Sequence, residues 1–227
     1  MTQPILVACS HGTDNLDGQA EITLLRSQIA ALRPGLGVRE AYVDVQQPAL
    51  PDVVAGLPAG SSAVIVPLLL SVGYHVQVDI AKAVAARELT VAAAPLGPDP
   101  RLAQLLKDRL GELGPDWGVV LAAAGSSRAE AAAAVEVMVA QLAQLVPNSV
   151  LAGYGAGAEP LVPAAVDIMR RKKANVTISS YLLAPGFFHD RLAQAGADTV
   201  TPALLPSRVI AQIALDRYDA ALRSLAP

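Results

Sequence analysis

The segment Ile5-Leu6-Val7-Ala8-Cys9-Ser10-His11-Gly12-Thr13 joins an uninterrupted apolar run to a polar turn. Five consecutive apolar residues have the length of a strand, and a strand that is apolar on both faces is typical of a parallel sheet covered by helices on both sides. Ligands of such sheets bind beyond the carboxyl ends of the strands. These nine residues therefore indicate both a fold and a place for chemistry.

The rest of the chain repeats the same pattern of a short apolar run followed by a longer segment of helical period. Further strand candidates are residues 38–43, 63–69, 89–93, 118–122, 149–153, 176–181 and 198–200. Helix candidates are residues 18–33, 49–56, 76–87, 101–112, 129–146, 159–172, 188–195 and 207–223. Strict alternation of strands and helices predicts an α/β protein built from parallel βα units.

The eight units divide into two sets of four. A shift of 113 residues places residues 7–13 on residues 120–126, and the same shift places Gly73-Tyr74 on Gly186-Phe187. A weak repeat of this kind, defined by element order and by punctuating residues, predicts two similar domains. The segment 111–115 contains two glycines and a proline, which suits a linker. We expect one domain at residues 1–113 and a second at residues 114–227.

Composition excludes several classes of protein. The chain has 227 residues, of which 53% are hydrophobic and 16% charged, which excludes a disordered protein or a coiled coil. A single cysteine excludes a disulfide framework and an iron–sulfur cluster held by several thiolates of this chain. With 17 basic and 20 acidic residues, the net charge of −3 predicts no nucleic-acid partner.

The sequence shows no targeting segment. Its start has no basic region, and its longest apolar stretch, residues 63–72, is interrupted by Pro67 and Ser71. That stretch is far shorter than the ~20 residues that span a bilayer. We therefore expect a cytoplasmic protein without a membrane partner.

Two of the three histidines follow strand candidates of the first half. His11 follows residues 5–9, and His75 follows residues 63–69. If the strand order is 2-1-3-4, strands one and three are neighbours, and both imidazoles lie at the same edge of the sheet. Asp44 follows strand two, on the other side of strand one. Taken singly, each histidine also fits an ordinary surface position, and Asp44 fits a turn or a helix cap.

A phosphoryl-transfer enzyme is an alternative, because some of these enzymes carry a nucleophilic histidine after the first strand. Such sites need an arginine beside the histidine to bind the phosphate. Here Ser10 precedes His11, and no arginine occurs before Arg26. The sequence therefore argues against this chemistry.

Three motifs of the first half, taken together, resemble the class II tetrapyrrole chelatases, in particular the sirohydrochlorin chelatase family. They are Ser10-His11-Gly12-Thr13, Tyr42-Val43-Asp44-Val45-Gln46-Gln47-Pro48 and Gly73-Tyr74-His75-Val76-Gln77-Val78-Asp79-Ile80. The resemblance implies two flavodoxin-like, four-stranded domains of the chelatase type. It also implies a lyase that inserts a divalent metal into sirohydrochlorin, most simply Fe²⁺ in siroheme biosynthesis. A cobaltochelatase of the cobalamin pathway, or a carrier of the tetrapyrrole or metal without turnover, is the alternative.

The resemblance also assigns site residues. It makes His11 and His75 bases and metal ligands, while Asp44 stands where the family has a longer glutamate. In the second half Ala124 replaces the first histidine, so that half lacks the pair. The residues expected to bind the substrate and its carboxylates are Gly12, Thr13, Gly73, Tyr74, Gly125, Ser126, Ser127, Arg128 and His189.

The expected ligands are a tetrapyrrole and a divalent metal, Fe²⁺ or Co²⁺, which is a substrate rather than a permanently bound cofactor. Imidazole accepts protons near neutral pH and suits both ions. Two linked halves make a monomer sufficient, and a homodimer is the alternative.

Overall fold

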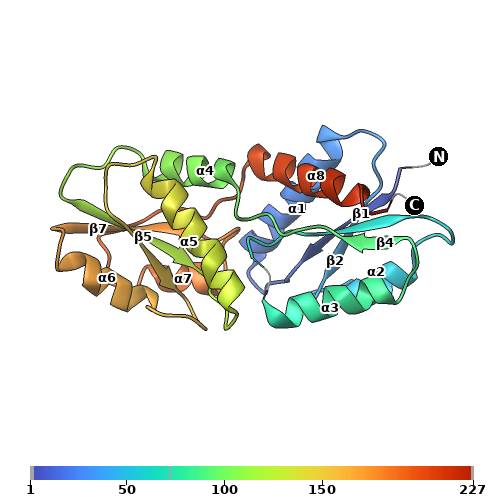
Figure 1. Ribbon diagram of the computed structural model, residues 1–227, viewed down its shortest axis with the longest axis horizontal. Helices are drawn as coiled ribbons and strands as arrows, with labels where there is room; N and C mark the ends of the chain where they lie inside the picture. The colour runs from blue at the N-terminus through green and yellow to red at the C-terminus, as the bar shows by residue number, and fades with distance from the viewer. Residues whose placement is uncertain (1–2, 72, 226–227) are drawn as a thin grey trace. The chain divides into compact units, whose positions relative to one another are not determined.

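The computed structural model describes residues 3–71 and 73–225, apart from the side chains of Tyr74 and His75 (Figure 1). The strands are β1 (Ile5–Ser10), β2 (Val38–Tyr42), β3 (Ala63–Pro67), β4 (Thr90–Ala92), β5 (Trp117–Ala123), β6 (Val150–Tyr154), β7 (Asn175–Tyr181) and β8 (Thr199–Val200). The helices are α1 (Leu16–Leu32), α2 (Leu50–Ala55), α3 (Tyr74–Ala85), α4 (Pro100–Leu110), α5 (Ala129–Ala143), α6 (Val162–Arg170), α7 (Phe187–Leu192) and α8 (Arg208–Leu222).

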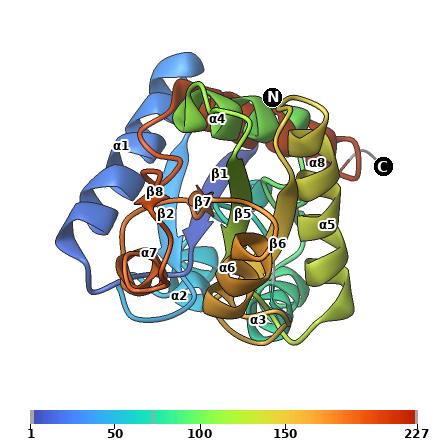
Figure 2. The same ribbon diagram turned by 90° about the vertical axis from the view of Figure 1, so that its left-hand side faces the viewer.

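The strands form two parallel four-stranded sheets with the same strand order. One sheet has the order β2-β1-β3-β4, and the other has the order β6-β5-β7-β8. Figure 2 shows the strands of the second sheet side by side, from β8 on the left to β6 on the right. The predicted α/β class, the pair of similar four-stranded domains and the 2-1-3-4 order are confirmed.

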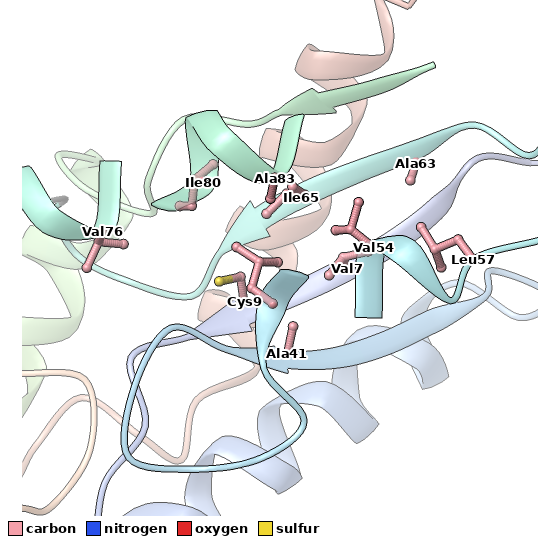
Figure 3. Packing of buried hydrophobic residues seen from close by; sticks show 11 residues of the cluster. Val7, Cys9, Ala41, Val54, Leu57, Ala63, Ile65, Val76, Ile80 and Ala83 are labelled. Carbon is pink, nitrogen blue, oxygen red and sulfur yellow. The ribbon is translucent and has the colours of Figure 1, made fainter. Parts of the chain in front are cut away.

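Helices cover both faces of the first sheet, which explains why its central strands are apolar throughout. In β1 the five residues after Ile5 are buried, and all five residues of β3 are buried. On one face Val7, Cys9 and Ile65 pack against residues of α2 and α3 (Figure 3). A strand buried on both sides has no polar face, so its sequence shows no alternation.

The sequence repeat and the structural units divide the chain at different places. Contacts group Met1–Leu96 with Leu205–Pro227 as unit 1, and Gly97–Leu204 as unit 2. Helix α4, from the first half of the sequence, packs on α5 and β7, whereas α8, from the second half, packs on α1 and β3. The boundary expected at residue 113 therefore does not coincide with the units, because each half exchanges its last helix for that of the other. Helical periodicity shows that α4 and α8 have apolar faces, but not which sheet receives them.

Polar contacts hold α8 in unit 1. Arg33 pairs with Asp219 through two hydrogen bonds, one of them 2.7 Å long between Nη2 and Oδ2. Arg217 donates to the carbonyl oxygens of Pro95 and Leu96 at 2.9 and 3.0 Å. The fully buried Tyr218 donates its hydroxyl to a backbone carbonyl near the start of the chain. These polar contacts, in addition to its apolar packing, give α8 a specific position in unit 1.

Within residues 3–71 and 73–225, no helix is both long enough and apolar enough to cross a lipid bilayer.

Candidate functional site

Three loops follow β1, β2 and β3 at the carboxyl edge of the first sheet. Strand β1 pairs with β2 on one side and with β3 on the other, so all three loops leave the same edge. The backbone N–H of Asp44 donates to the carbonyl oxygen of His11 at 2.9 Å, and Val43 donates to Ser10 at 3.1 Å. The loops that carry His11 and Asp44 are therefore in direct backbone contact, as their places after neighbouring strands predict.

Gly12 makes this close approach possible. Its φ is +101°, and a Cβ atom built on it would overlap the carbonyl oxygen of Asp44 and lie 3.2 Å from the backbone nitrogen of Gln46. Any larger residue at this position must separate the two loops or change the backbone. The predicted role of Gly12 in substrate binding stays a prediction, and the structure shows a packing requirement at the same position.

Side-chain hydrogen bonds connect the two loops to each other and to α1. The N–H of Thr13 donates to Oε1 of Gln46 at 3.0 Å, and Gln19 donates to the Thr13 carbonyl at 2.8 Å. The Thr13 hydroxyl accepts from the N–H of Asn15, whose own side chain caps α1. Gln46 lies in the motif at residues 42–48, whose pattern predicts no role for it. Only the tertiary contact reveals that its side chain joins the two loops.

His11 and Asp44 both have exposed side chains at this edge. Within the part of the chain that the structure describes, the His11 imidazole has no hydrogen-bond partner, so both of its nitrogens are open to a ligand. The Asp44 carboxylate accepts through Oδ1 from the N–H of Val45 at 2.8 Å. Val45 has a φ of +61°, and this turn leaves Oδ2 of Asp44 without a partner among the described residues.

The second predicted histidine lies in the helix that follows β3. Gly73 is the N-cap of α3, and the helix begins at Tyr74, two residues earlier than predicted. His75 is therefore the second residue of the first helical turn. The side chains of Tyr74 and His75 lie outside the described residues. The pairing of His75 with His11 stays a prediction, supported by the direct pairing of β1 with β3.

Unit 2 repeats the backbone of this site. Ala156 donates to the carbonyl oxygen of Ala124 at 3.0 Å, as Asp44 donates to His11. Gly125 has a φ of +87°, and a Cβ atom on it would overlap the carbonyl oxygen of Ala156, as on Gly12. The two loops of unit 1 thus recur in unit 2, with alanines in place of the imidazole and the carboxylate.

In unit 2 an apolar residue also stands where unit 1 has its second histidine. Gly186 is the N-cap of α7 as Gly73 is of α3, so Phe188 takes the helix position of His75 without an insertion. His189 follows one residue later, and its Nε2 lies 3.4 Å from the carbonyl oxygen of Thr201. His189 therefore does not stand at the helix position of His75. Its contact with a substrate stays a prediction.

The loop after β5 holds the other predicted substrate-binding residues. Ser126 accepts through its hydroxyl from the N–H of Arg128 at 3.2 Å, while Ser127 is exposed. The Arg128 side chain pairs with Glu130 at 3.2 Å. The pKa of Glu130 is lowered, first by its own backbone N–H and then by Arg128. Arg128 is therefore already compensated by a carboxylate, which weakens the case for it as a substrate ligand.

A preformed metal cage is absent from the described residues, which contain no group of three or more His, Cys, Asp or Glu side chains. Cys9 is fully buried, and burial, with a smaller contribution from Asp79, raises the pKa of its thiol to about 12. Burial and protonation make this thiol a poor metal ligand at neutral pH. The exposed groups at this edge that could bind a metal are the His11 imidazole and the Asp44 carboxylate.

Known proteins resemble the chain in both sequence and fold. Residues 5–113, slightly less than half of the chain, match the CbiX family model. A comparison with curated protein sequences finds no significant match.

Solved chelatase structures share the fold over nearly the whole chain. SirB from Bacillus subtilis, solved with Fe³⁺, is 16% identical with a TM-score of 0.76, covering 99% of this chain and 96% of SirB. SirB from the subspecies spizizenii, solved with cobalt, is 16% identical with a TM-score of 0.74, covering 99% and 95%. CbiX of denitrifying bacteria, described as the terminal enzyme of siroheme biosynthesis, is 20% identical with a TM-score of 0.69, covering 96% and 99%.

Proposed function

We propose that this chain, whose residues 5–113 belong to the CbiX family and which has the class II chelatase fold, inserts a divalent metal ion into sirohydrochlorin. The observation that carries the proposal is the exposed His11 imidazole, which is held at the carboxyl edge of β1 by backbone contact with the Asp44 loop. His75 lies in the first turn of α3, the helix after the neighbouring strand. The structures of SirB with Fe³⁺ and with cobalt support a metal substrate.

The reaction needs groups that accept protons and release a cation. A divalent ion enters the macrocycle as two pyrrole N–H protons leave, so the charge balances. The neutral imidazole of a histidine binds a metal or accepts a proton. We assign both tasks to His11 and His75. Oδ2 of Asp44 is the further proton acceptor at this edge.

Iron is the metal that we propose first, with cobalt as the alternative. Imidazole and carboxylate ligands suit both ions, and selectivity between them often depends on supply. The buried Cys9 thiol offers no competing thiolate. A site of exposed imidazole and carboxylate binds a cation weakly enough to release it into the macrocycle.

The test is anaerobic incubation of the purified chain with metal-free sirohydrochlorin and Fe²⁺ or Co²⁺, followed by the visible spectrum. We expect insertion faster than the uncatalysed reaction. His11→Ala should abolish the enhancement, and Asp44→Asn should reduce it about tenfold or more, as expected for a lost proton acceptor. Asp52→Asn is the matched control, because Asp52 is an exposed carboxylate in α2. Insertion at the uncatalysed rate with both metals would refute the proposal.

A carrier without turnover is the second candidate, because Oδ1 of Asp44 already accepts a hydrogen bond from Val45, and unit 2 has Ala124 and Phe188 at the positions of His11 and His75. Such a protein binds one equivalent of sirohydrochlorin and leaves the insertion rate unchanged. The number of macrocycles metallated per protein molecule separates the two: a value above one excludes the carrier.

A further inference from the structure

Val45 combines two unfavourable features in the loop after β2. Its φ of +61° lies in the left-handed region, where a β-branched side chain is strained. Its side chain is 51% exposed, whereas Val43, two residues earlier, packs against the apolar core of unit 1. An exposed apolar side chain gains little from packing, so neither the backbone conformation nor the core favours a valine at this position.

The hydrogen bonds of the turn explain the positive φ but not the valine. The N–H of Gln46 donates to the carbonyl oxygen of Asp44 at 2.6 Å, and the N–H of Val45 donates to Oδ1 of Asp44 at 2.8 Å. The first of these bonds closes a three-residue turn centred on Val45, which is rare because its central residue is strained. Glycine adopts a positive φ without steric cost. The turn alone would therefore favour glycine at position 45.

Unit 2 makes the corresponding turn with a glycine. Ala156, which takes the place of Asp44, is followed by Gly157, whose φ is +71°. A Cβ atom on Gly157 would lie 2.8 Å from the carbonyl carbon of Ser126, so unit 2 leaves no room for a side chain at this point. Unit 1 has room here and carries an exposed valine. The side chain is therefore a feature of the unit that holds His11.

The exposed side chain lies next to the groups assigned to the reaction. Asp44, the preceding residue, donates its N–H to the carbonyl oxygen of His11 at 2.9 Å. Gln46, the following residue, accepts from the N–H of Thr13 at 3.0 Å. A ligand as wide as a tetrapyrrole that contacts His11 and Asp44 is therefore within reach of Val45. An exposed apolar side chain beside polar reactive groups suits the apolar part of such a ligand.

We propose that Val45 contacts the apolar ring surface of sirohydrochlorin and so positions the macrocycle relative to His11 and Asp44. The inference rests on the proposed function and extends it by a substrate-binding residue of unit 1. Burial of the side chain against the ligand then offsets the free-energy cost of an exposed and strained valine. Continuity with the edge that carries His11 favours this occupant over a protein partner.

The test is anaerobic titration of the full chain with metal-free sirohydrochlorin, without metal, to obtain Kd. We expect Val45→Gly to raise Kd about fivefold, as for the loss of a half-buried valine contact. Its midpoint of urea denaturation should not fall, because glycine suits the positive φ. Val45→Ile keeps a β-branched apolar side chain and should keep Kd within about twofold of the wild-type value. In turnover, KM should rise with Kd in Val45→Gly and kcat should stay unchanged.

Leu89→Gly is the matched control. Leu89 has a φ of +55° and is 52% exposed, so it shares both features with Val45. Its carbonyl oxygen accepts from the N–H of Ala63, the first residue of β3, which places it at the amino edge of the sheet, away from His11. Leu89→Gly should therefore change the denaturation midpoint as Val45→Gly does and leave Kd unchanged.

Equal Kd values for the wild type and Val45→Gly would overturn this inference and leave the proposed function intact. A Kd raised as much by Leu89→Gly as by Val45→Gly would also overturn it, because the effect would then be a general one on the fold. A denaturation midpoint that falls in Val45→Gly but not in Leu89→Gly would do the same, since the valine would then serve packing within the chain. Wild-type protein that neither binds nor metallates sirohydrochlorin would overturn the proposed function, and this inference with it.

Discussion

Replacing Gly12 by alanine tests whether the contact between the first two loops holds the site together. The residue has a φ of +101°, which costs an alanine about 1 kcal/mol of folding free energy. Its Cβ atom would also overlap the Asp44 carbonyl oxygen and lie 3.0 Å from the Asp44 carbonyl carbon. Backbone atoms at this position cannot rotate away as the end of a flexible side chain can, so the loops must separate.

Separation breaks two hydrogen bonds. One runs from the Asp44 N–H to the His11 carbonyl, and the other from the Thr13 N–H to the Gln46 side chain. At about 1 kcal/mol each, they add about 2 kcal/mol to the backbone term, so the free energy of unfolding should fall by about 3 kcal/mol. Because His11 leaves its position, metal insertion should also fall to the level of His11→Ala.

Gly35→Ala is the matched control. Gly35 has a φ of +87°, and a Cβ atom on it meets no heavy atom within 4 Å, so only the backbone term of about 1 kcal/mol remains. Urea denaturation followed by far-ultraviolet circular dichroism measures both variants. Equal losses of stability in Gly12→Ala and Gly35→Ala would refute the reasoning, because the loop contact would then contribute nothing.

Two pH effects follow from the pKa shifts. Burial raises the pKa of Cys9 to about 12, so the native thiol stays protonated while the unfolded thiol ionises near 9, and stability should fall with pH between these values. The slope is at most about 1.4 kcal/mol per pH unit, and Cys9→Ala should remove it; identical slopes in urea titrations of the two proteins would contradict this. The Arg33 hydrogen bond chiefly lowers the pKa of Asp219, so this pair stabilises α8 above the ordinary aspartate pKa of about 3.9 and loses its effect as the pH falls through the lowered folded value. Asp219→Asn should therefore cost less than about 1 kcal/mol at pH 7, since the pair is partly exposed, and the cost should shrink as the pH falls through the lowered folded pKa of Asp219; a cost that does not change with pH would exclude the ion pair as its cause.

Most of the fold follows from local sequence patterns. Apolar runs such as residues 5–9 predict buried strands because a strand between two helical layers has no polar face, and β1 and β3 are buried in this way. The polar residues after these runs predict the functional edge. The repeat also predicts that Gly125 stands where Gly12 does, and the two glycines share both a positive φ and a contact with the neighbouring loop.

Contacts between distant residues could not be predicted in the same way. Gln46 lies in the motif at residues 42–48. Its hydrogen bond to Thr13 joins residues that are 33 positions apart in the sequence, and no local pattern predicts such a contact. Likewise, the repeat places Phe188 on His75, but only the glycine N-caps of α7 and α3 show that the two residues hold the same position in their helices.

By itself, the sequence determined the strand and helix order, the parallel α/β class, the twofold repeat and the edge that carries His11, because each of these depends on the polarity of neighbouring residues. Only the tertiary structure decided that α4 and α8 exchange places between the units, that Gln46 joins the two loops and that Phe188 fills the space over Gly155. The physical reason is that an apolar helix face or a short polar side chain is satisfied by many partners. Packing and hydrogen-bond geometry select one of them.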